Sequence, residues 1–407
     1  MNRLVLIGNG FDLAHGLKTK YEHFIDWYWK NRILNLYQES SNISDDHLCK
    51  LTILHESSWN VFVFHNSLSL KSSEGKDIYK FLMENKEYFK IEFSPFFERI
   101  HKSIDTKGWV DIENEYYDLL KQYVLEYGDV SEIEKLNSQL LFLQELLVKY
   151  LSGIGIQDKL LNTGIRQKIY APFERTDISV EGLQAFDDHI ITGLKTDNSL
   201  LDAKFRQYSN CYTSGFVDDY RGKYDNKIVH YDEIPKELML PNQIMLLNFN
   251  YTHTAQIYCK DGAIFSVNQI HGDLDKPKSV IFGYGDELDS DFKAIVDKND
   301  NRYLGNIKSI RYLEADNYRK VLSFIESEPY QIIIMGHSCG NSDRTLLNTL
   351  FEHKNCVSIK PYYYKRGKDD DNYIELVQNI SRNFKDMKLM RDRVVNKTYC
   401  EPLTNKQ

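Results

Sequence analysis

The sequence lacks the marks of a zinc-ribbon, disulfide-rich or membrane-spanning protein. Its six cysteines are scattered without a Cys-x-x-Cys pair, which excludes the common zinc-ribbon spacings and gives no sign of a disulfide framework. No stretch approaches the roughly 18 consecutive apolar residues that a transmembrane helix needs. The N-terminus runs directly into a strand pattern instead of a signal peptide, so we expect a cytoplasmic protein.

Excess positive charge is also missing. The 407 residues carry a formal net charge of -8, and the pI is about 5.9. This balance argues against a nucleic-acid partner or an anionic membrane surface. The length predicts two or three domains, or one domain with a large insertion.

The most informative stretch is an apolar run, residues 4–7, that leads into a glycine-containing loop. Apolar residues without polar alternation are typical of a strand buried on both faces, as in a parallel sheet covered by helices. Gly8 and Gly10 allow backbone N–H groups to approach a ligand with no Cβ between them, as in phosphate-binding loops. The alternative is a tight turn that leaves the strand, because a single Gly-x-Gly is a short motif.

This loop departs from the usual dinucleotide fingerprint. The third glycine of Gly-x-Gly-x-x-Gly would fall at Leu13. A capping-box pattern predicts that a helix begins only near Lys20. We therefore expect residues 11–18 to form an extended loop that carries Asp12 and His15.

A rhythm of strands and helices resumes near residue 244. Buried strands are predicted at 244–250, 264–270, 279–282, 331–335 and 356–362. Helices are predicted at 252–259, 289–298, 315–327 and 372–380, with another that ends near residue 351. Strands alternating with helices imply an α/β fold with a parallel sheet flanked by helices and right-handed crossovers.

A large, mostly helical insertion is expected after the first strand and helix. Amphipathic patterns predict helices at 20–38, 108–127 and 131–151. Short helices and polar loops are expected at 39–75, and loops or small strands at 169–173 and 216–231. The predicted domains are a Rossmann-like core of residues 1–38 and 241–386, an insertion of 39–240 and a peripheral tail of 387–407.

Four predicted strands end in polar or glycine-containing loops. These loops are 8–12, 248–253, 271–273 and 336–343. Because ligands bind at the carboxyl ends of strands in an open parallel sheet, we expect the four loops to line one crevice.

One of these loops matches the Gly-x-Ser-x-Gly nucleophile elbow of serine hydrolases, with Ser338 at its centre. Such an enzyme needs an acid and then a histidine after the serine, but only His353 follows and too little chain remains. We therefore interpret Gly336, Ser338 and Asp343 as a second loop facing a phosphate or ribose.

Several motifs together resemble a known family. They are Gly-Asn-Gly-Phe-Asp-Leu-Ala-His-Gly-Leu at 8–17, Trp-Val-Asp-Ile-Glu at 109–113, Asn-Phe-Asn-Tyr-Thr at 248–252, His-Gly at 271–272, Phe-Gly-Tyr-Gly at 282–285 and Gly-His-Ser at 336–338. The chain resembles the AbiH family of bacterial abortive-infection proteins. That family is similar to the sirtuin superfamily, in which a Rossmann-like sheet binds NAD and many antiphage members hydrolyse it.

The resemblance implies site residues, motif by motif. Asn250 matches the asparagine of the sirtuin-type Thr-x-Asn-Tyr/Ile-Asp segment, and His271 matches the histidine of its His-Gly pair. Asn248 and Thr252 depart from that segment, and the cysteine-borne zinc module of deacetylases is absent, so the resemblance implies NAD binding and cleavage more than protein deacetylation. The implied NAD-binding residues are Gly8, Asn9, Gly10, Phe11, Asp12, His15, Glu113, Asn248, Tyr251, Gly283, Gly336, His337, Ser338 and Asp343.

These residue types suit cleavage of the nicotinamide–ribose bond, which develops an oxocarbenium ion. Asn250 would orient water or the ribose, and His271 would accept a proton. Asp12 or Glu113 would stabilise the positive charge. Each residue also has a structural alternative: His271 could bond to backbone, Asn250 could form a turn, and the helix dipole favours Glu113 in a first turn.

The sequence thus predicts an antiphage effector that binds and hydrolyses NAD or a related nucleotide. Two alternatives stay open: a non-catalytic nucleotide sensor that signals through its insertion, and a nuclease. A nuclease would depend on a divalent metal held by Asp12, Asp273, Asp286 or Asp343. The implied partners are a nucleotide and a phage-derived trigger or partner defence protein, and self-association into a homo-oligomer stays open.

Overall fold

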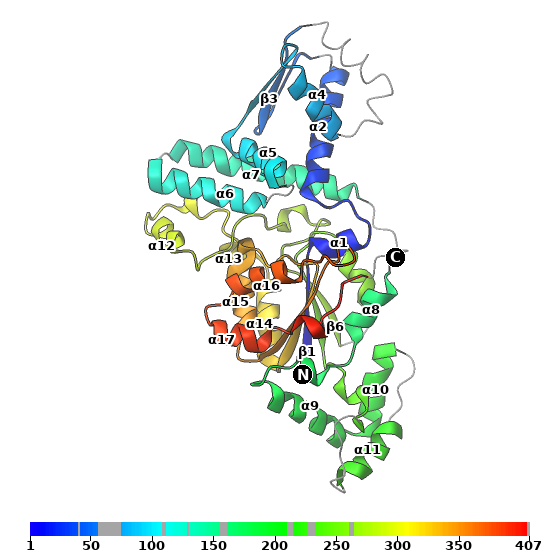
Figure 1. Ribbon diagram of the computed structural model, residues 1–407. Coiled ribbons are helices and arrows are strands. Elements are labelled where there is room, and N and C mark those ends of the chain that lie inside the picture. The colour runs from blue at the N-terminus through cyan, green and yellow to red at the C-terminus, as the bar shows by residue number, and fades with distance from the viewer. Residues whose placement is uncertain are drawn as a thin grey trace. The chain divides into compact units, whose positions relative to one another are not determined.

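The computed structural model describes residues 1–39, 41–55, 75–107, 111–127, 130–154, 161–209, 215–225, 233–259 and 264–404. Contacts divide the chain into two compact units (Figure 1). Unit 1 consists of Met1–Leu17, Ile156–Ile281 and Tyr312–Gln407, and unit 2 consists of Lys18–Gly155 and Phe282–Arg311. Among the described residues, none of the helices combines the length and apolar content that crossing a bilayer requires.

Unit 1 is built on a parallel sheet of five strands. The strands are β1 (Asn2–Ile7), β5 (Ile244–Asn248), β6 (Phe265–Gln269), β7 (Tyr330–Met335) and β8 (Cys356–Tyr362). Their order across the sheet is β6-β5-β1-β7-β8, and every neighbouring pair is parallel. The predicted α/β class and parallel sheet are confirmed. From β1 the chain adds β5 and then β6 on one side, and then crosses over to add β7 and β8 on the other side. The topological switch point therefore lies between β1 and β7.

Side chains of β1 divide between two hydrophobic clusters, one on each face of the sheet. Val5 and Ile7 belong to one cluster, and Leu4 and Leu6 to the other. This is why the apolar run shows no polar alternation: neither face of the strand reaches water. Burial of each such side chain stabilises the fold by about 1.5–3 kcal/mol.

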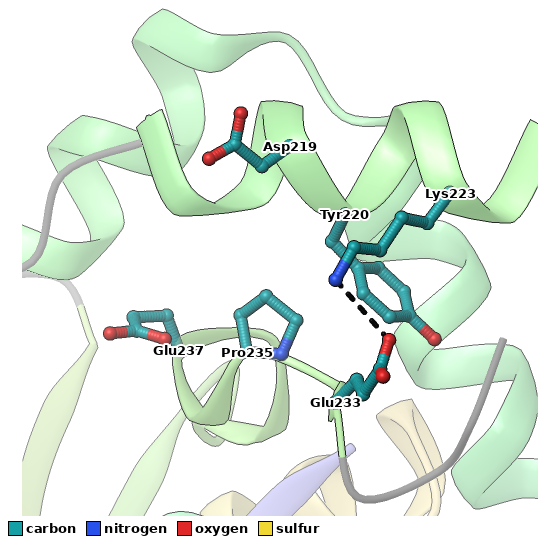
Figure 2. A pocket seen from close by; sticks show the side chains of 6 residues that line it. All are labelled: Asp219, Tyr220, Lys223, Glu233, Pro235 and Glu237. Atoms are coloured by element: carbon teal, nitrogen blue, oxygen red, sulfur yellow. Dashed lines mark hydrogen bonds and ion pairs between the residues drawn. The ribbon is translucent and has the colours of Figure 1, made fainter.

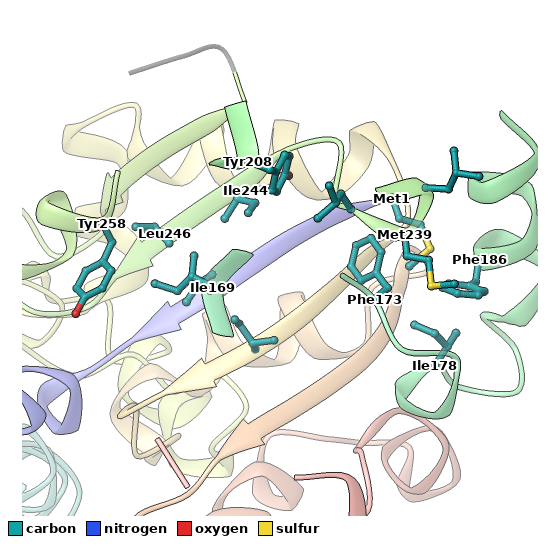
Figure 3. Close-up of a cluster of buried hydrophobic side chains, with 14 of the residues drawn as sticks. Met1, Ile169, Phe173, Ile178, Phe186, Tyr208, Met239, Ile244, Leu246 and Tyr258 are labelled. Carbon is teal, nitrogen blue, oxygen red and sulfur yellow. The ribbon is translucent and has the colours of Figure 1, made fainter. Parts of the chain in front are cut away.

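Helices supply the other half of each cluster. The Val5 face packs against α8 (Thr163–Tyr170), α9 (Leu183–Lys195), α10 (Asn198–Ser209) and α11 (Gly215–Asp225). Figure 3 shows Ile169, Phe173, Ile244 and Leu246 gathered on this face. The Leu4 face packs against α14 (Asn317–Ser327), α15 (Arg344–Phe351), α16 (Tyr373–Arg382) and α17 (Met387–Arg393).

Unit 2 combines helices with a small antiparallel sheet. Its described α-helices are α2 (Tyr21–Glu39), α4 (Gly75–Glu84), α5 (Pro95–Lys107), α6 (Ile112–Lys121), α7 (Val130–Ser152), α12 (Ser290–Val296) and α13 (Lys308–Arg311). A π-helical turn, Gln122–Tyr127, follows α6. The sheet has the order β2 (Ile43–Asp45), β3 (Cys49–Ile53) and β4 (Phe89–Phe93).

The structure corrects several predicted elements. A short helix, α1 (Asn9–Ala14), follows Gly8 directly, so the expected extended loop over 11–18 was wrong for its first half. Residues 279–282 form no strand: a 3-10 turn ends at Ser279, and the Ile281 N–H instead donates to the His271 carbonyl. The antiparallel strands β2 and β3 lie where short helices and loop were expected.

Other differences concern the predicted insertion and tail. Residues 169–170 end α8 and 216–225 lie in α11, where loops or small strands were expected; 226–231, Trp109 and Val110 fall outside the described residues. The helices α8 to α11 belong to unit 1, whereas the predicted insertion of 39–240 included them. The predicted tail also packs on unit 1, where Arg393 donates to the Phe351 carbonyl at 2.6 Å.

Candidate functional site

The loops after β1 and β7 meet through their backbones at the switch point. The Gly10 N–H donates to the Gly336 carbonyl at 2.8 Å, and the Gly8 N–H donates to the Met335 carbonyl at 3.3 Å. A Cβ added to Gly336, whose φ is +76°, would lie 2.1 Å from the Phe11 nitrogen. These glycines are therefore required for close contact between the two loops. The N–H groups of Gly8 and Gly10 already donate to backbone carbonyls, so in this structure they do not point to a phosphate.

Two histidines flank one carboxylate near these strand ends. His271, just beyond β6, places Nε2 3.2 Å from Asp343 Oδ1. His337, just after β7, places its Nε2 3.6 Å from the other oxygen, Oδ2. All three residues are buried. Phe249 lies beside both rings, at centroid distances of 5.2 Å from His271 and 4.1 Å from His337.

Both ring nitrogens of His271 have partners. Nδ1 lies 3.2 Å from the Phe249 carbonyl, an acceptor that favours a proton on Nδ1. Nε2 lies 3.2 Å from the Tyr312 hydroxyl, which can donate to a lone pair, and 3.2 Å from Asp343 Oδ1, which favours a proton there. The backbone bond expected as the structural alternative is present, and it orients the ring with Nε2 toward Asp343.

One ring nitrogen of His337 accepts from the backbone. Its Nδ1 accepts from the Cys339 N–H at 3.0 Å, so the ring proton belongs on Nε2. The Nε2 proton of His337 faces Asp343 Oδ2 at 3.6 Å, an ion-pair distance that is too long for a hydrogen bond. Asp343 orients both rings from the residue that precedes α15.

Asn248 and Asn250 organise the loop after β5. Asn248 is fully buried; its amide donates to the Thr252 carbonyl at 3.0 Å, and its oxygen accepts from the Asn250 N–H at 3.1 Å. The turn-forming role considered for Asn250 is thus carried by Asn248. Asn250 uses its side-chain amide to donate to the Gly8 carbonyl at 3.0 Å, which ties the β5 loop to the β1 loop.

Asp12 is a buried carboxylate with one unsatisfied oxygen. Its Oδ2 accepts from the Thr252 hydroxyl at 2.6 Å, while its Oδ1 has no hydrogen-bond partner. The side chain belongs to α1 and is only 1% exposed. Burial raises the pKa of Asp12 to about 6. Ionisation of this buried carboxyl group is energetically costly. Buried carboxyl groups with raised pKa values are common at functional sites.

Three predicted residues have mainly structural partners. His15 bonds through Nδ1 to the Phe11 carbonyl at 2.7 Å and through Nε2 to the Tyr258 hydroxyl at 2.6 Å. Phe11 is a core side chain. Tyr251 donates to the Ile281 carbonyl at 3.1 Å.

Ser338 does not have the strained backbone of a nucleophile elbow. The positive φ, 54°, belongs to Cys339, one residue later. Ser338 itself is exposed, as is Asn9 in the β1 loop. The backbone therefore gives no support to a serine nucleophile at this position.

Glu113 and Gly283 meet inside unit 2. Glu113 Oε1 accepts from the Gly283 N–H at 3.1 Å, and Oε2 pairs with Lys308 Nζ at 2.8 Å. Asp111 caps α6 by accepting from Asn114 N at 3.0 Å. The motifs that contain Glu113 and Gly283 are therefore joined by a hydrogen bond, and Lys308 neutralises the Glu113 carboxylate.

Sequence reasoning missed Tyr312 and Phe249 as neighbours of the histidines. Phe249 lies inside a motif that the sequence did single out, so its position carried a signal. Tyr312 comes from a short 3-10 turn after a segment of unit 2 and matches no motif. Its role depends on chain topology that the local sequence does not encode.

Two pockets lie away from the strand ends. The first, about 290 Å³, is lined by Asp219, Tyr220, Lys223, Glu233, Pro235 and Glu237 (Figure 2). Its lysine already pairs with Glu233 at 3.2 Å, so excess carboxylate disfavours a nucleotide phosphate there. The second, about 380 Å³, lies in unit 2, and its Lys121 is likewise surrounded by Asp118 and Asp291. The cluster at the strand ends is the better candidate for nucleotide chemistry.

One family model, described as bacteriophage abortive infection AbiH, matches residues 4–364, from β1 to just past β8. No curated protein and no solved structure matches the chain. The family match spans most of the 407 residues and confirms the resemblance seen in the motifs. The chain therefore belongs to the AbiH family, and membership implies a role in bacteriophage abortive infection.

Proposed function

We propose that this protein acts in abortive infection by hydrolysing NAD, or a related nucleotide, at the carboxyl end of the unit 1 sheet. The observation that carries the proposal is the position of His271. Its Nδ1 contacts the Phe249 carbonyl, and Asp343 Oδ1 lies 3.2 Å from its Nε2, so the carboxylate stabilises a proton on that nitrogen. A buried imidazole paired with a carboxylate can take up and hold a proton.

In the proposed reaction, a water oxygen attacks C1′ of the nicotinamide ribose. The bond between C1′ and the nicotinamide nitrogen breaks, and its electron pair leaves with neutral nicotinamide. Nε2 of His271 takes the proton from the water, so the products are nicotinamide, ADP-ribose and one proton. The transition state carries positive charge on the ribose, and the ionised carboxylate of Asp12 stabilises it.

The strand ends supply further support. Asn250 links the β5 and β1 loops through Gly8, which fixes its amide beside Asp12 and Thr252. In a sheet with this strand order, ligands bind outside the carboxyl ends near the switch point, where these loops lie. The sirtuin-type details of the site and its preference for NAD are part of the proposal.

Mass spectrometry of NAD incubated with purified full-length protein, alone and with lysate from phage-infected cells as the activator, tests the proposal. We expect nicotinamide and ADP-ribose to appear, and His271→Asn to lower the rate by 10²- to 10⁴-fold. His353→Asn is the matched control, because its Nε2 pairs with Glu326 at 3.1 Å at the surface. Intact NAD under both conditions, or full activity of His271→Asn, overturns the hydrolase. Saturable binding without turnover would favour the non-catalytic sensor.

A further inference from the structure

His253, Asp273 and Asp275 form a compact cluster that the proposed hydrolysis does not use. His253 Nε2 lies 2.6 Å from Asp273 Oδ1 and 3.8 Å from Asp275 Oδ2. One ligand atom from each residue lies within 4.8 Å of the other two. His253 comes from the loop after β5 and the aspartates from the loop after β6, so two neighbouring strands bring the three side chains together.

The β6 loop holds its carboxylates in place with backbone bonds. The Asp275 N–H donates to Asp273 Oδ1 at 2.8 Å, and the Asp273 N–H donates to Ser279 Oγ at 3.1 Å. A Cβ on Gly272, whose φ is +88°, would lie 2.1 Å from the Ser279 carbonyl oxygen, so only glycine allows this tight turn. The turn therefore presents two carboxylates to one imidazole.

The charge and chemistry of the cluster suit a divalent cation. Two carboxylates and a neutral imidazole carry a formal charge of about -2, which one divalent ion balances. Imidazole nitrogen favours first-row transition metals, and carboxylate oxygen is shared by Mn²⁺ and the harder cations. Side chains of His253 and Asp273 are 23% and 25% exposed, and that of Asp275 is 80% exposed, so an ion can enter from solvent.

We propose that His253 Nε2 and one oxygen each of Asp273 and Asp275 bind a divalent transition-metal ion of the Mn²⁺ or Zn²⁺ type. Metal binding replaces the hydrogen bond between Nε2 and Asp273 Oδ1, so the two atoms move apart as both turn to the metal. Three protein ligands leave positions for water or phosphate oxygens. Recruitment of a nucleotide phosphate to this ion rests on the proposed function, but metal binding itself does not.

Electron paramagnetic resonance of Mn²⁺ titrated with the full-length protein tests this site. Mn²⁺ is the better probe because thiolates bind Zn²⁺ strongly, and cysteines elsewhere in the chain would compete for it. We expect one saturable site in the wild type. Asp273→Asn and His253→Ala should each weaken Mn²⁺ binding more than tenfold. Asp275→Asn, on an exposed side chain that cannot disturb folding, should weaken it several-fold.

Matched controls are His353→Ala and Asp316→Asn, which alter a histidine and an exposed aspartate in other ion pairs. Both should leave Mn²⁺ binding unchanged. No saturable binding by the wild type, or equal binding by wild type and Asp275→Asn, overturns the site. Because the titration contains no nucleotide, such a failure leaves the NAD hydrolysis proposal standing, and failed hydrolysis leaves this one standing.

Discussion

Unit 1 and unit 2 each bury carboxylates, but the partners of these carboxylates differ between the two units. In unit 2, Glu113 is satisfied at both oxygens, by the Gly283 N–H and by Lys308. In unit 1, Asp12 keeps one oxygen without a partner, and Asp343 lies between two histidines. A fully compensated charge serves the fold, whereas an uncompensated one costs stability and is typical of a functional site.

The largest effect should come from breaking the compensated pair in unit 2. Lys308→Met leaves Glu113 buried without its counter-charge and should lower the free energy of unfolding by about 3–5 kcal/mol. Urea denaturation followed by circular dichroism measures the change. Lys320→Met, in an exposed pair with Asp316, is the control and should cost at most about 1 kcal/mol. An equal, small effect of both variants would contradict the contrast between the units.

The uncompensated carboxylate should behave in the opposite way. The pKa of Asp12 is about 6 in the folded protein and near 3.8 when unfolded, so wild-type stability falls as the pH rises from about 4 to 6. Asp12→Asn removes this penalty and should stabilise the protein by roughly 3 kcal/mol at pH 7, with little change at pH 4. NAD cleavage should fall in the same variant. Denaturation curves at the two pH values measure the gain, and a loss of stability at pH 7 would refute the assignment.

Asp343 sharpens the comparison as a positioning residue. Asp343→Asn keeps the shape but loses the charge that stabilises the His271 imidazolium, so kcat should fall about 10- to 100-fold while KM stays unchanged. Steady-state assay of NAD cleavage separates the two constants. A purely structural role would instead lower the melting temperature and reduce kcat and active protein in proportion.

Tyr312 should give the smallest effect. Tyr312→Phe removes a hydroxyl 3.2 Å from His271 Nε2 and leaves the ring packed against Tyr318. Loss of one hydrogen bond of about 1 kcal/mol predicts a three- to tenfold lower rate. The same assay measures it, with Tyr116→Phe in unit 2 as the control. A drop as large as that of His271→Asn would mean that the hydroxyl takes part in proton transfer.

The sequence predicted the parallel strands well, because buried strands require uninterrupted apolar runs such as 332–335. It did not predict β2 and β3, whose three and five residues pair only with each other and β4, across a segment with weak local preference. The helix α1 was missed because its stability comes from Phe11 packing in the core, not from a cap signal. Tertiary contacts decided each of these cases.

The candidate site was predictable as a set of strand ends, but not as a set of contacts. Convergence of the loops follows from a parallel sheet, and the structure brings His271, His337 and Asp343 together. The pairing of Glu113 with Lys308 depends on the segment 282–311 joining unit 2, which no local pattern encodes. The hydrogen-bond partners of Asn250 and His271 likewise depend on tertiary structure, because both side chains contact backbone carbonyls of other loops.

The glycine contact at the switch point limits how this sequence can diverge. Gly8, Gly10 and Gly336 are held by each other's backbones, so a side chain at any one of them collides with the opposite loop. A substitution at one of the three cannot be compensated by a smaller residue at another, because glycine is already the smallest residue. A related sequence in which the histidines and Asp12 had changed would therefore still carry all three glycines.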